Sequence, residues 1–166
     1  MEFKKSAGLA IIYDKMILLA HPTGSNWKNS FGIPKGGLEK GESNLEAAIR
    51  EVGEEIGIHI KPNQIEKTEK SFTISKQKKL SKVVYYYYVK IDNLSEIGLK
   101  DTRVPKNQLQ LKEIDWAGFM DYNEAIKKVT KSQIPLINAL RNDGLLEKKT
   151  NLKHLKLFEN YFKLKK

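Results

Sequence analysis

The alternation of apolar and polar residues divides the chain into short strands, one strong helix and a helical end. Two apolar runs, residues 7–13 and 16–20, are separated by Asp14 and Lys15. This pattern predicts two strands joined by a tight polar turn rather than one helix. Patterns of the same kind predict three further strands and two helical segments interrupted near Pro135, at residues 71–75, 82–91, 113–119, 122–129 and 133–140.

The clearest helix is predicted at residues 43–56. Ser43 followed by Glu46 has the spacing of a capping box, and Gly57 is a typical helix end. The apolar residues of this segment fall on one helical face: Leu45, Ala48, Ile49, Val52 and Ile56. Strands on both sides of this helix, with more helices at the end, predict an α/β domain with a mixed sheet.

Two segments do not fit the strand and helix patterns of the domain. Residues 93–110 are predicted as a long polar connection, and loops of that length are often functional. After Gly144 the chain is rich in lysine and carries a Leu/Phe stripe, which predicts an amphipathic helix. We therefore expect one domain at residues 1–142 and a basic C-terminal helix at residues 143–166 that docks on it.

Composition narrows the class of protein. The chain has 166 residues, no cysteine, and 30 Lys plus Arg against 20 Asp plus Glu, a net charge of +10. The missing cysteine excludes a disulfide scaffold, a thiolate zinc site and a cysteine nucleophile. No apolar run is long enough for a membrane span, and no secretory signal is visible. These features predict a cytoplasmic protein without a membrane partner.

The charge is unevenly distributed. Residues 61–82 hold seven basic and two acidic residues, and residues 141–166 hold eight and three, so each segment has a balance of +5. Residues 36–58 hold two basic and six acidic residues, a balance of −4. Lysine-rich surfaces attract polyphosphates, including nucleic acid. The acidic segment needs a different explanation.

Three carboxylates of the predicted helix, Glu51, Glu54 and Glu55, fall on one narrow face beside the apolar stripe. Such crowding destabilises a helix, but Mg²⁺ or Mn²⁺ takes oxygen ligands of this kind. Arg50 could fix one carboxylate through a bidentate pair, and backbone carbonyls of the loop at 35–41 could reach the same metal. The alternative is a solvated acidic helix face.

The spacing within this segment is specific. Residues 36–58 read G-x5-E-x7-R-E-U-x-E-E-x-G-U, where U is aliphatic. This pattern resembles the signature of the Nudix (MutT-like) hydrolases at every fixed position. The resemblance implies the family's α/β/α sandwich over about residues 1–140. It also implies Mg²⁺-dependent cleavage of the pyrophosphate linkage of a nucleoside diphosphate linked to another group, X.

The resemblance also implies roles for the residues of the signature. Metal ligation would come from carboxylates and from one backbone carbonyl: Glu51, Glu54, Glu55 and Lys35 or Gly36. One of the three carboxylates would help to activate water. Glu42 and Arg50 would orient the loop and the helix at the catalytic centre, and Gly57 is a structural position of the signature.

Motifs outside the signature bear on the substrate. Pro34-Lys35-Gly36 resembles the PKG form of diadenosine tetraphosphate hydrolases and of messenger-RNA decapping relatives, and Asp115-Trp116 resembles the diadenosine group. That group often has Glu six residues before the Trp, where this chain has Gln110. Glu113 is the nearest acid and the candidate substitute as general base. The first expectation is a dinucleoside polyphosphate or a nucleoside triphosphate.

Aromatic residues give further candidates for substrate contacts. In a strand, alternate members of the tyrosine run 85–88 face opposite sides. One pair is expected in the core, and the other could stack on a base; core packing is the favoured interpretation. Trp27 and Phe31 have the same two interpretations. The substrate-binding candidates are Lys35, Trp27, Tyr86 and Tyr88. The three histidines lie in no metal-ligand spacing and are expected to have structural or surface roles.

Two other functions remain open at this stage. The PKG motif and the basic segments favour an RNA 5′-end pyrophosphohydrolase or decapping enzyme as the alternative enzyme. An alternative of another class is a non-catalytic Nudix-fold module that senses nucleotides, although such modules typically lose signature carboxylates that this chain retains. The expected partner is a nucleotide-type polyphosphate, with RNA possible, and the chain is expected to be a monomer or a homodimer.

Overall fold

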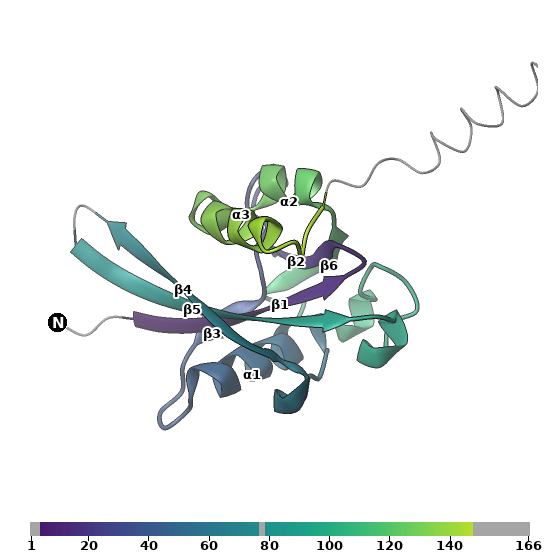
Figure 1. Ribbon diagram of the computed structural model, residues 1–166, viewed down its shortest axis with the longest axis horizontal. Helices are drawn as coiled ribbons and strands as arrows, with labels where there is room; N and C mark the ends of the chain where they lie inside the picture. Colours follow the sequence, from purple (N-terminus) through teal and green to yellow (C-terminus); the bar gives the residue numbers. More distant parts are fainter. Residues whose placement is uncertain (1–3, 77–78, 148–166) are drawn as a thin grey trace, which may run out of the picture.

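A six-stranded mixed sheet separates one long helix from two shorter helices (Figure 1). The computed structural model describes residues 4–76 and 79–147. The sheet is made of β1 (Lys4–Tyr13), β2 (Met16–Pro22), β3 (Lys35–Gly37), β4 (Glu66–Lys76), β5 (Lys79–Ile91) and β6 (Ile114–Met120). The helices are α1 (Asn44–Ile56), α2 (Tyr122–Lys128) and α3 (Ile134–Asn142). The strand order is β4-β5-β1-β2-β6, and β3 pairs with β1.

The pairing of strands confirms the predicted mixed sheet. β1 runs parallel to β5 and antiparallel to β2 and β3. Asp14 and Lys15, between β1 and β2, have φ values of 49° and 61°. A two-residue turn with positive φ at both positions matches the twist of the strands that it joins. The predicted polar turn is therefore a tight β-hairpin.

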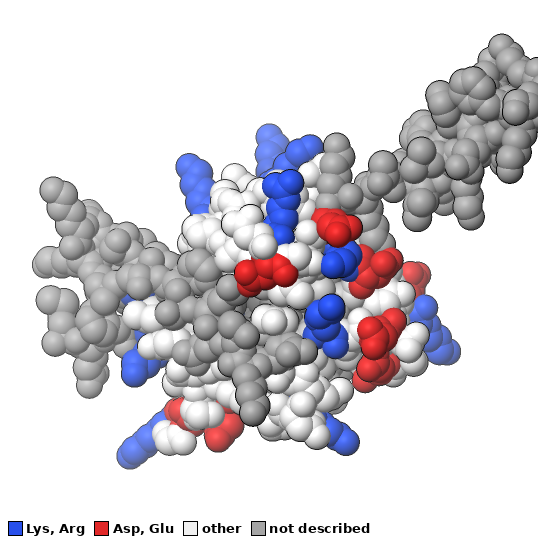
Figure 2. All heavy atoms as spheres, viewed as in Figure 1, with Lys and Arg blue, Asp and Glu red and all other residues white. Residues whose placement is uncertain are grey.

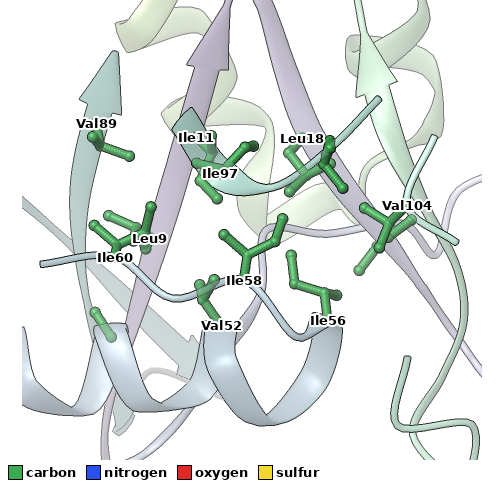
Figure 3. Close-up of a cluster of buried hydrophobic side chains, with 14 of the residues drawn as sticks. Leu9, Ile11, Leu18, Val52, Ile56, Ile58, Ile60, Val89, Ile97 and Val104 are labelled. Atoms are coloured by element: carbon green, nitrogen blue, oxygen red, sulfur yellow. The ribbon is translucent and has the colours of Figure 1, made fainter. Parts of the chain in front are cut away.

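Side chains of β1 alternate between two cores, one on each face of the sheet. Leu9 and Ile11 point to the α1 side, where Figure 3 shows them above Val52 and Ile56. Ala10 and the other alternate residues belong to a second cluster on the side of α2 and α3. Because β1 is buried on both faces, it reads as a continuous apolar run rather than an alternating one.

Helix α1 follows the sequence prediction closely. The Ser43 side chain accepts a hydrogen bond from the Glu46 backbone N–H at 3.1 Å, so Ser43 is the N-cap. Gly57 ends the helix with φ 67°, in the left-handed region that glycine adopts without steric cost. These two ends fix the helix across β1, which places its last two turns beside β3.

The segment at residues 93–110 is less polar in character than predicted, because part of it is buried. Four apolar side chains of this segment are buried in the core on the α1 side: Ile97, Leu99, Val104 and Leu109. The Val104 N–H donates to the Ala117 carbonyl and the Phe119 N–H to the Thr102 carbonyl, both at 2.9 Å. The segment therefore covers the free edge of β6, a protection that sheet edges commonly need.

The end of the domain differs from prediction in one detail. Pro135 does not interrupt a helix; it lies in the first turn of α3, where the missing N–H costs no hydrogen bond. After α3, Leu145 and Leu146 are buried without forming a helix. The remainder of the helix predicted at residues 143–166 lies outside the described residues. Within the described ranges, no helix has the length and apolar character to cross a membrane.

Candidate active site

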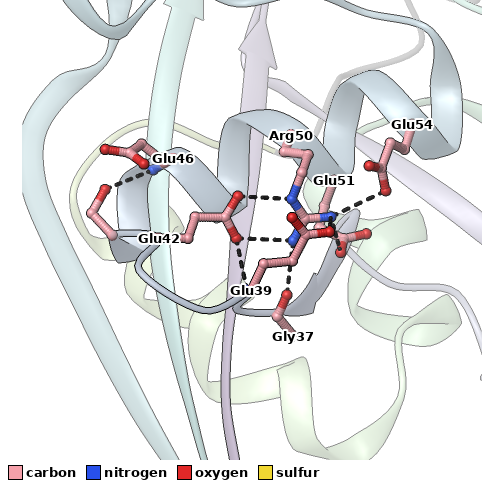
Figure 4. Close-up of polar contacts among 8 residues, drawn as sticks. Gly37, Glu39, Glu42, Glu46, Arg50, Glu51 and Glu54 are labelled. Carbon is pink, nitrogen blue, oxygen red and sulfur yellow. Dashed lines mark hydrogen bonds and ion pairs between the residues drawn. The ribbon is translucent and has the colours of Figure 1, made fainter.

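Arg50 joins the loop after β3 to the acidic face of α1 (Figure 4). Its Nε and Nη2 donate to the two carboxylate oxygens of Glu42, at 2.8 and 3.0 Å, and Nη2 also donates to the Gly37 carbonyl at 2.9 Å. Its Nη1 donates to Glu51 at 3.0 Å and to Glu54 at 3.1 Å. The expected bidentate pair is thus present, and its carboxylate is Glu42.

The three helical carboxylates do not share one environment. The side chain of Glu54 is 58% exposed, whereas that of Glu51 is 13% exposed. Glu55 is buried and lines the cavity described below. Among the described residues, no three His, Cys, Asp or Glu side chains are gathered in the arrangement of a metal site. Arg50 holds two of the three expected ligands.

A cavity of about 430 Å³ opens beside α1 and β3. Its charged lining residues are Lys35, Glu55, Lys82 and Glu113. Its neutral polar lining residues are Ser30, Thr130, Ser132 and Gln133. Ala20, Ile33 and Ile114 are among the apolar residues that complete the wall. The cavity therefore has the concave shape and the convergent polar groups typical of a small-molecule site.

Carboxyl groups are crowded at one side of this cavity. Burial, and then repulsion by Glu51 and Glu113, raises the pKa of Glu55 to about 8. Burial also raises the pKa of Glu51, against the hydrogen bond and the charge of Arg50, which lower it. The structure thus brings Glu113 close to two carboxylates of the signature. Carboxylates whose pKa values are raised by burial and by each other mark a candidate catalytic site.

The position of Glu113 follows from a short turn packed on the end of α1. The Gln110 N–H donates to the Glu55 carbonyl at 2.9 Å, and the Gln110 carbonyl accepts from the Glu113 N–H at 2.9 Å. This turn carries the Glu113 side chain to the cavity. Gln110, which replaces the acid expected six residues before Trp116, therefore helps to position the acid that is present.

Two lysines face the same cavity. Lys35 starts β3 and Lys82 lies near the start of β5, and both side chains line the cavity. Burial, and then the charge of Lys82, lowers the pKa of Lys35 to about 8, against the attraction of Glu55 and Glu51. Two ammonium groups held this close in a partly buried place make a site suited to an anion.

The aromatic candidates have different environments. Tyr86 is 4% exposed and packs in the core on the side of α2 and α3, and Tyr88 is half-buried against the same core. Burial raises the pKa of the Tyr86 hydroxyl. Neither tyrosine is among the residues that line the cavity. Tyr86 packs in the core, which is the favoured interpretation of the sequence, and a substrate contact of either tyrosine stays a prediction. Trp27, by contrast, is 52% exposed.

Sequence reasoning missed Lys82 and Gln133. Lys82 is on the same face of β5 as the buried residues Val84 and Tyr86. A lysine on the buried face of a strand could therefore have been recognised in the sequence as a candidate functional residue. Gln133 is 3% exposed, and its side-chain oxygen accepts from the Ile33 N–H at 2.8 Å. No local pattern marks it, because its partner lies 100 residues away.

Described basic and acidic side chains are mixed on one face of the molecule. On the face drawn in Figure 2, the described Lys and Arg side chains alternate with Asp and Glu side chains. The lysines most relevant to an anion are instead the two at the cavity.

The family assignment agrees with this arrangement. The sequence profile described as the NUDIX domain matches residues 3–140, which is most of the chain. The chain therefore belongs to the Nudix domain family. This confirms the predicted family of pyrophosphohydrolases, and the observed sheet and helices confirm the predicted α/β/α fold.

Solved structures share the fold at low sequence identity. The Ap4A hydrolase of C. elegans is 22% identical, with a TM-score of 0.61, over 87% of this chain and 99% of that chain. A NUDIX hydrolase from Nitrosomonas europaea is 16% identical, with a TM-score of 0.60, over 87% and 92%. A bifunctional NMN adenylyltransferase/ADP ribose pyrophosphatase from Francisella tularensis is 18% identical, with a TM-score of 0.60, over 86% and 42%. At these identities the likeness extends to the fold alone.

Proposed function

We propose that this protein hydrolyses a pyrophosphate linkage in a dinucleoside polyphosphate or a nucleoside triphosphate, with Mg²⁺ or Mn²⁺ as cofactor. One observation carries the proposal: a single cavity is lined by Lys35 and Lys82 together with Glu55 and Glu113. Cations suit the phosphate chain, and acids suit metal binding and proton transfer. Diadenosine tetraphosphate is the first substrate to test, because the PKG motif resembles that group.

The donor set fits a hard divalent cation in kind. Glu51 is partly buried and Glu55 is buried, and burial is the main cause that raises the pKa of each carboxyl group. Oxygen ligands are the ones that Mg²⁺ and Mn²⁺ prefer. The residues that would hold the metal are Glu51, Glu54, Glu55 and the backbone of Gly36. Once bound, such an ion neutralises phosphate charge and lowers the pKa of a coordinated water.

The remaining chemistry falls to residues at the cavity. Lys35 and Lys82 bind phosphate oxygens and hold the polyphosphate of the substrate in place while water attacks a phosphorus atom. Glu113 is the proposed general base, since it lines the cavity but lies outside the signature helix. The water oxygen forms a bond to phosphorus, its proton passes to Glu113, and the P–O bond to the leaving phosphate breaks. Arg50 keeps Glu51 and Glu42 in place throughout.

The neutral end of the cavity is proposed to bind the nucleoside. Because the Gln133 side-chain oxygen already accepts from Ile33, the group it can offer a ligand is its amide N–H. Ser132 and Thr130 add hydroxyl groups beside it. An end with one fixed donor and two hydroxyls suits the ring nitrogens and oxygens of a nucleobase, while the charged end suits phosphates.

A substrate panel tests the proposal. The protein is incubated with Mg²⁺ and diadenosine tetraphosphate, nucleoside triphosphates, ADP-ribose or 5′-triphosphorylated RNA, and the products are separated by chromatography. We expect turnover of the first two classes, stopped by EDTA and lost in the Glu54→Gln/Glu55→Gln variant. Lys35→Gln should lower kcat/KM, whereas Lys40→Gln, at an exposed lysine of the loop after β3, should leave it unchanged.

Other outcomes would favour the alternatives. No turnover of any substrate, or turnover that persists in the double Gln variant, would contradict the enzyme proposal and favour a nucleotide sensor. Preference for RNA with a steep fall in affinity as salt rises would favour the 5′-end enzyme, because phosphate contacts release counterions. Preference for ADP-ribose would overturn the substrate class while retaining the reaction.

A further inference from the structure

His21, near the end of β2, is fully buried between two oxygen acceptors. Its Nε2–H donates to the Asn26 carbonyl at 2.9 Å, since a carbonyl can only accept. Its Nδ1 lies 2.5 Å from a carboxylate oxygen of Asp115, within hydrogen-bonding distance. Asp115 belongs to β6, so the imidazole ties the loop after β2 to the neighbouring strand.

The same loop is braced internally. The Asn26 side-chain oxygen accepts from the backbone N–H groups of Lys28 and Asn29, at 3.0 and 2.9 Å. The Ser30 hydroxyl donates to the Asn26 carbonyl. Asn26 therefore makes the hydrogen bonds that organise this loop, and the hydrogen bond from His21 to the Asn26 carbonyl anchors it to β2.

Trp27 lies flat on this support. Its ring is stacked on the His21 ring, with centroids 3.6 Å apart and planes 10° apart, and its edge meets the Phe31 ring at 5.7 Å. Yet Trp27 is 52% exposed. An indole with one face covered by a fixed planar group and much of its surface open is arranged to receive a second planar group.

This loop borders the proposed nucleotide cavity. Pro22 and Ser30, which flank Trp27 in the sequence, line the cavity, and so does Ile114, the neighbour of Asp115. The hydrogen bonds of His21 thus fix a segment of the cavity wall and the exposed indole beside it. Packing alone would explain a buried Trp27, but not one held rigidly with half of its surface in solvent.

We infer that His21 is a positioning residue which, with Asp115, holds Trp27 as a one-sided stacking platform for a nucleobase of the substrate. The inference rests on the proposed function in one respect, that the ligand carries a nucleobase. Stacking of a base on an aromatic side chain is a sequence-tolerant contact. The platform would therefore accept different bases and strengthen binding without taking part in the reaction.

The test compares a ligand that has a base with one that does not. ADP and inorganic pyrophosphate are titrated in EDTA, so that nothing is hydrolysed, while tryptophan fluorescence and heat are recorded. ADP should quench fluorescence in the wild type, and pyrophosphate should not. Trp27→Leu should lose the quench and bind ADP about ten-fold more weakly, with pyrophosphate affinity unchanged. Trp27→Phe should recover part of the ADP affinity.

The His21 variants test the positioning role. His21→Leu should weaken ADP although Trp27 is present, and His21→Gln, which keeps a donor toward Asn26, should lie between it and the wild type. In turnover assays KM should rise while kcat falls much less. Lys40→Gln, an exposed change in the loop after β3, is the control and should bind ADP like the wild type. If His21→Leu melts below the assay temperature, the comparison uses His21→Gln.

The outcomes separate this inference from the proposed function. Wild-type affinity for ADP in Trp27→Leu would overturn the platform even if the enzyme hydrolyses nucleotides. Equal losses of ADP and pyrophosphate affinity in His21→Gln would overturn the positioning role. An ADP quench without turnover of any nucleotide would retain the platform and reject the enzyme.

Discussion

Gly36 and Glu51 occupy adjoining space so tightly that a side chain at position 36 would overlap the Glu51 carboxyl group. At Gly37, one residue further along β3, an added Cβ would meet no atom within 4 Å. The backbone of β3 therefore passes directly against one of the proposed metal ligands. The Nudix signature requires glycine at position 36, and this contact supplies the physical reason.

Gly36→Ala is expected to lower kcat/KM by about 100-fold or more, because displacing a catalytic group by about 1 Å has effects of that size. This value is measured from the steady-state hydrolysis of the substrate identified in the panel. Thermal melting of the variant checks that it is folded. Gly37→Ala is the matched control and should retain activity within about three-fold of the wild type. Equal activities of the two variants would show that the Glu51 contact does not matter.

Arg50→Lys should destabilise the fold as well as reduce activity. Lysine cannot reproduce the two parallel bonds to Glu42 or reach Gly37, Glu51 and Glu54 together. We expect a loss of about 2 kcal/mol in the free energy of unfolding, the size typical of hydrogen bonds to charged groups. Urea unfolding measures it. Glu46→Gln, an exposed change on the same helix, should cost less than about 0.5 kcal/mol.

Glu42 gives a pH-dependent prediction. Its hydrogen bonds from Arg50 lower the pKa of the carboxyl group in the folded protein. A group with a depressed folded pKa stabilises the fold above its unfolded pKa, about 4.3, and this contribution disappears as the pH falls through the folded value. The difference in unfolding free energy between wild type and Glu42→Gln should therefore be largest near neutral pH and shrink below about pH 4. A difference independent of pH would contradict this.

Local signals were sufficient for much of the fold. The hairpin at Asp14 and Lys15 and the helix between Ser43 and Gly57 are set by neighbours in the sequence, and both were predicted. The segment at residues 93–110 was not, because its buried residues are separated by polar ones and show neither helical nor strand period. Its structure depends on the edge of β6, which no local pattern reveals.

The residues of the candidate site likewise fall into those that local sequence predicts and those that it does not. The residues of α1 and β3 were predicted because the signature is a contiguous segment, and Glu113 was predicted because it is the acid nearest to an expected position. Lys82 and Gln133 come from elements that meet at the cavity only in the folded chain. His21 was expected to be structural, and its contacts with Asn26 and Asp115 show how a structural residue can shape a binding surface.

Glu55 should reveal a conflict between stability and function. Its carboxyl group is buried beside Glu51 and Glu113, which raises its pKa to about 8, so ionised Glu55 at about this pH and above is destabilising when no metal is bound. Glu55→Gln removes one charge and keeps the shape, and at pH 8 in EDTA it should be about 1–2 kcal/mol more stable than the wild type.

The addition of Mg²⁺ should reverse this difference. A metal ion that binds only the folded state, and not the unfolded state, stabilises the folded protein by mass action. The melting temperature of the wild type should therefore rise with Mg²⁺ concentration. The gain should be much smaller in Glu55→Gln, which lacks a charged ligand and should be inactive. Glu46→Gln, a matched change on the same helix, should respond to Mg²⁺ like the wild type. An equal rise in all three proteins would place the metal somewhere other than this group of carboxylates, and a Glu55→Gln variant less stable than the wild type in EDTA would show that the buried charge is compensated within the chain.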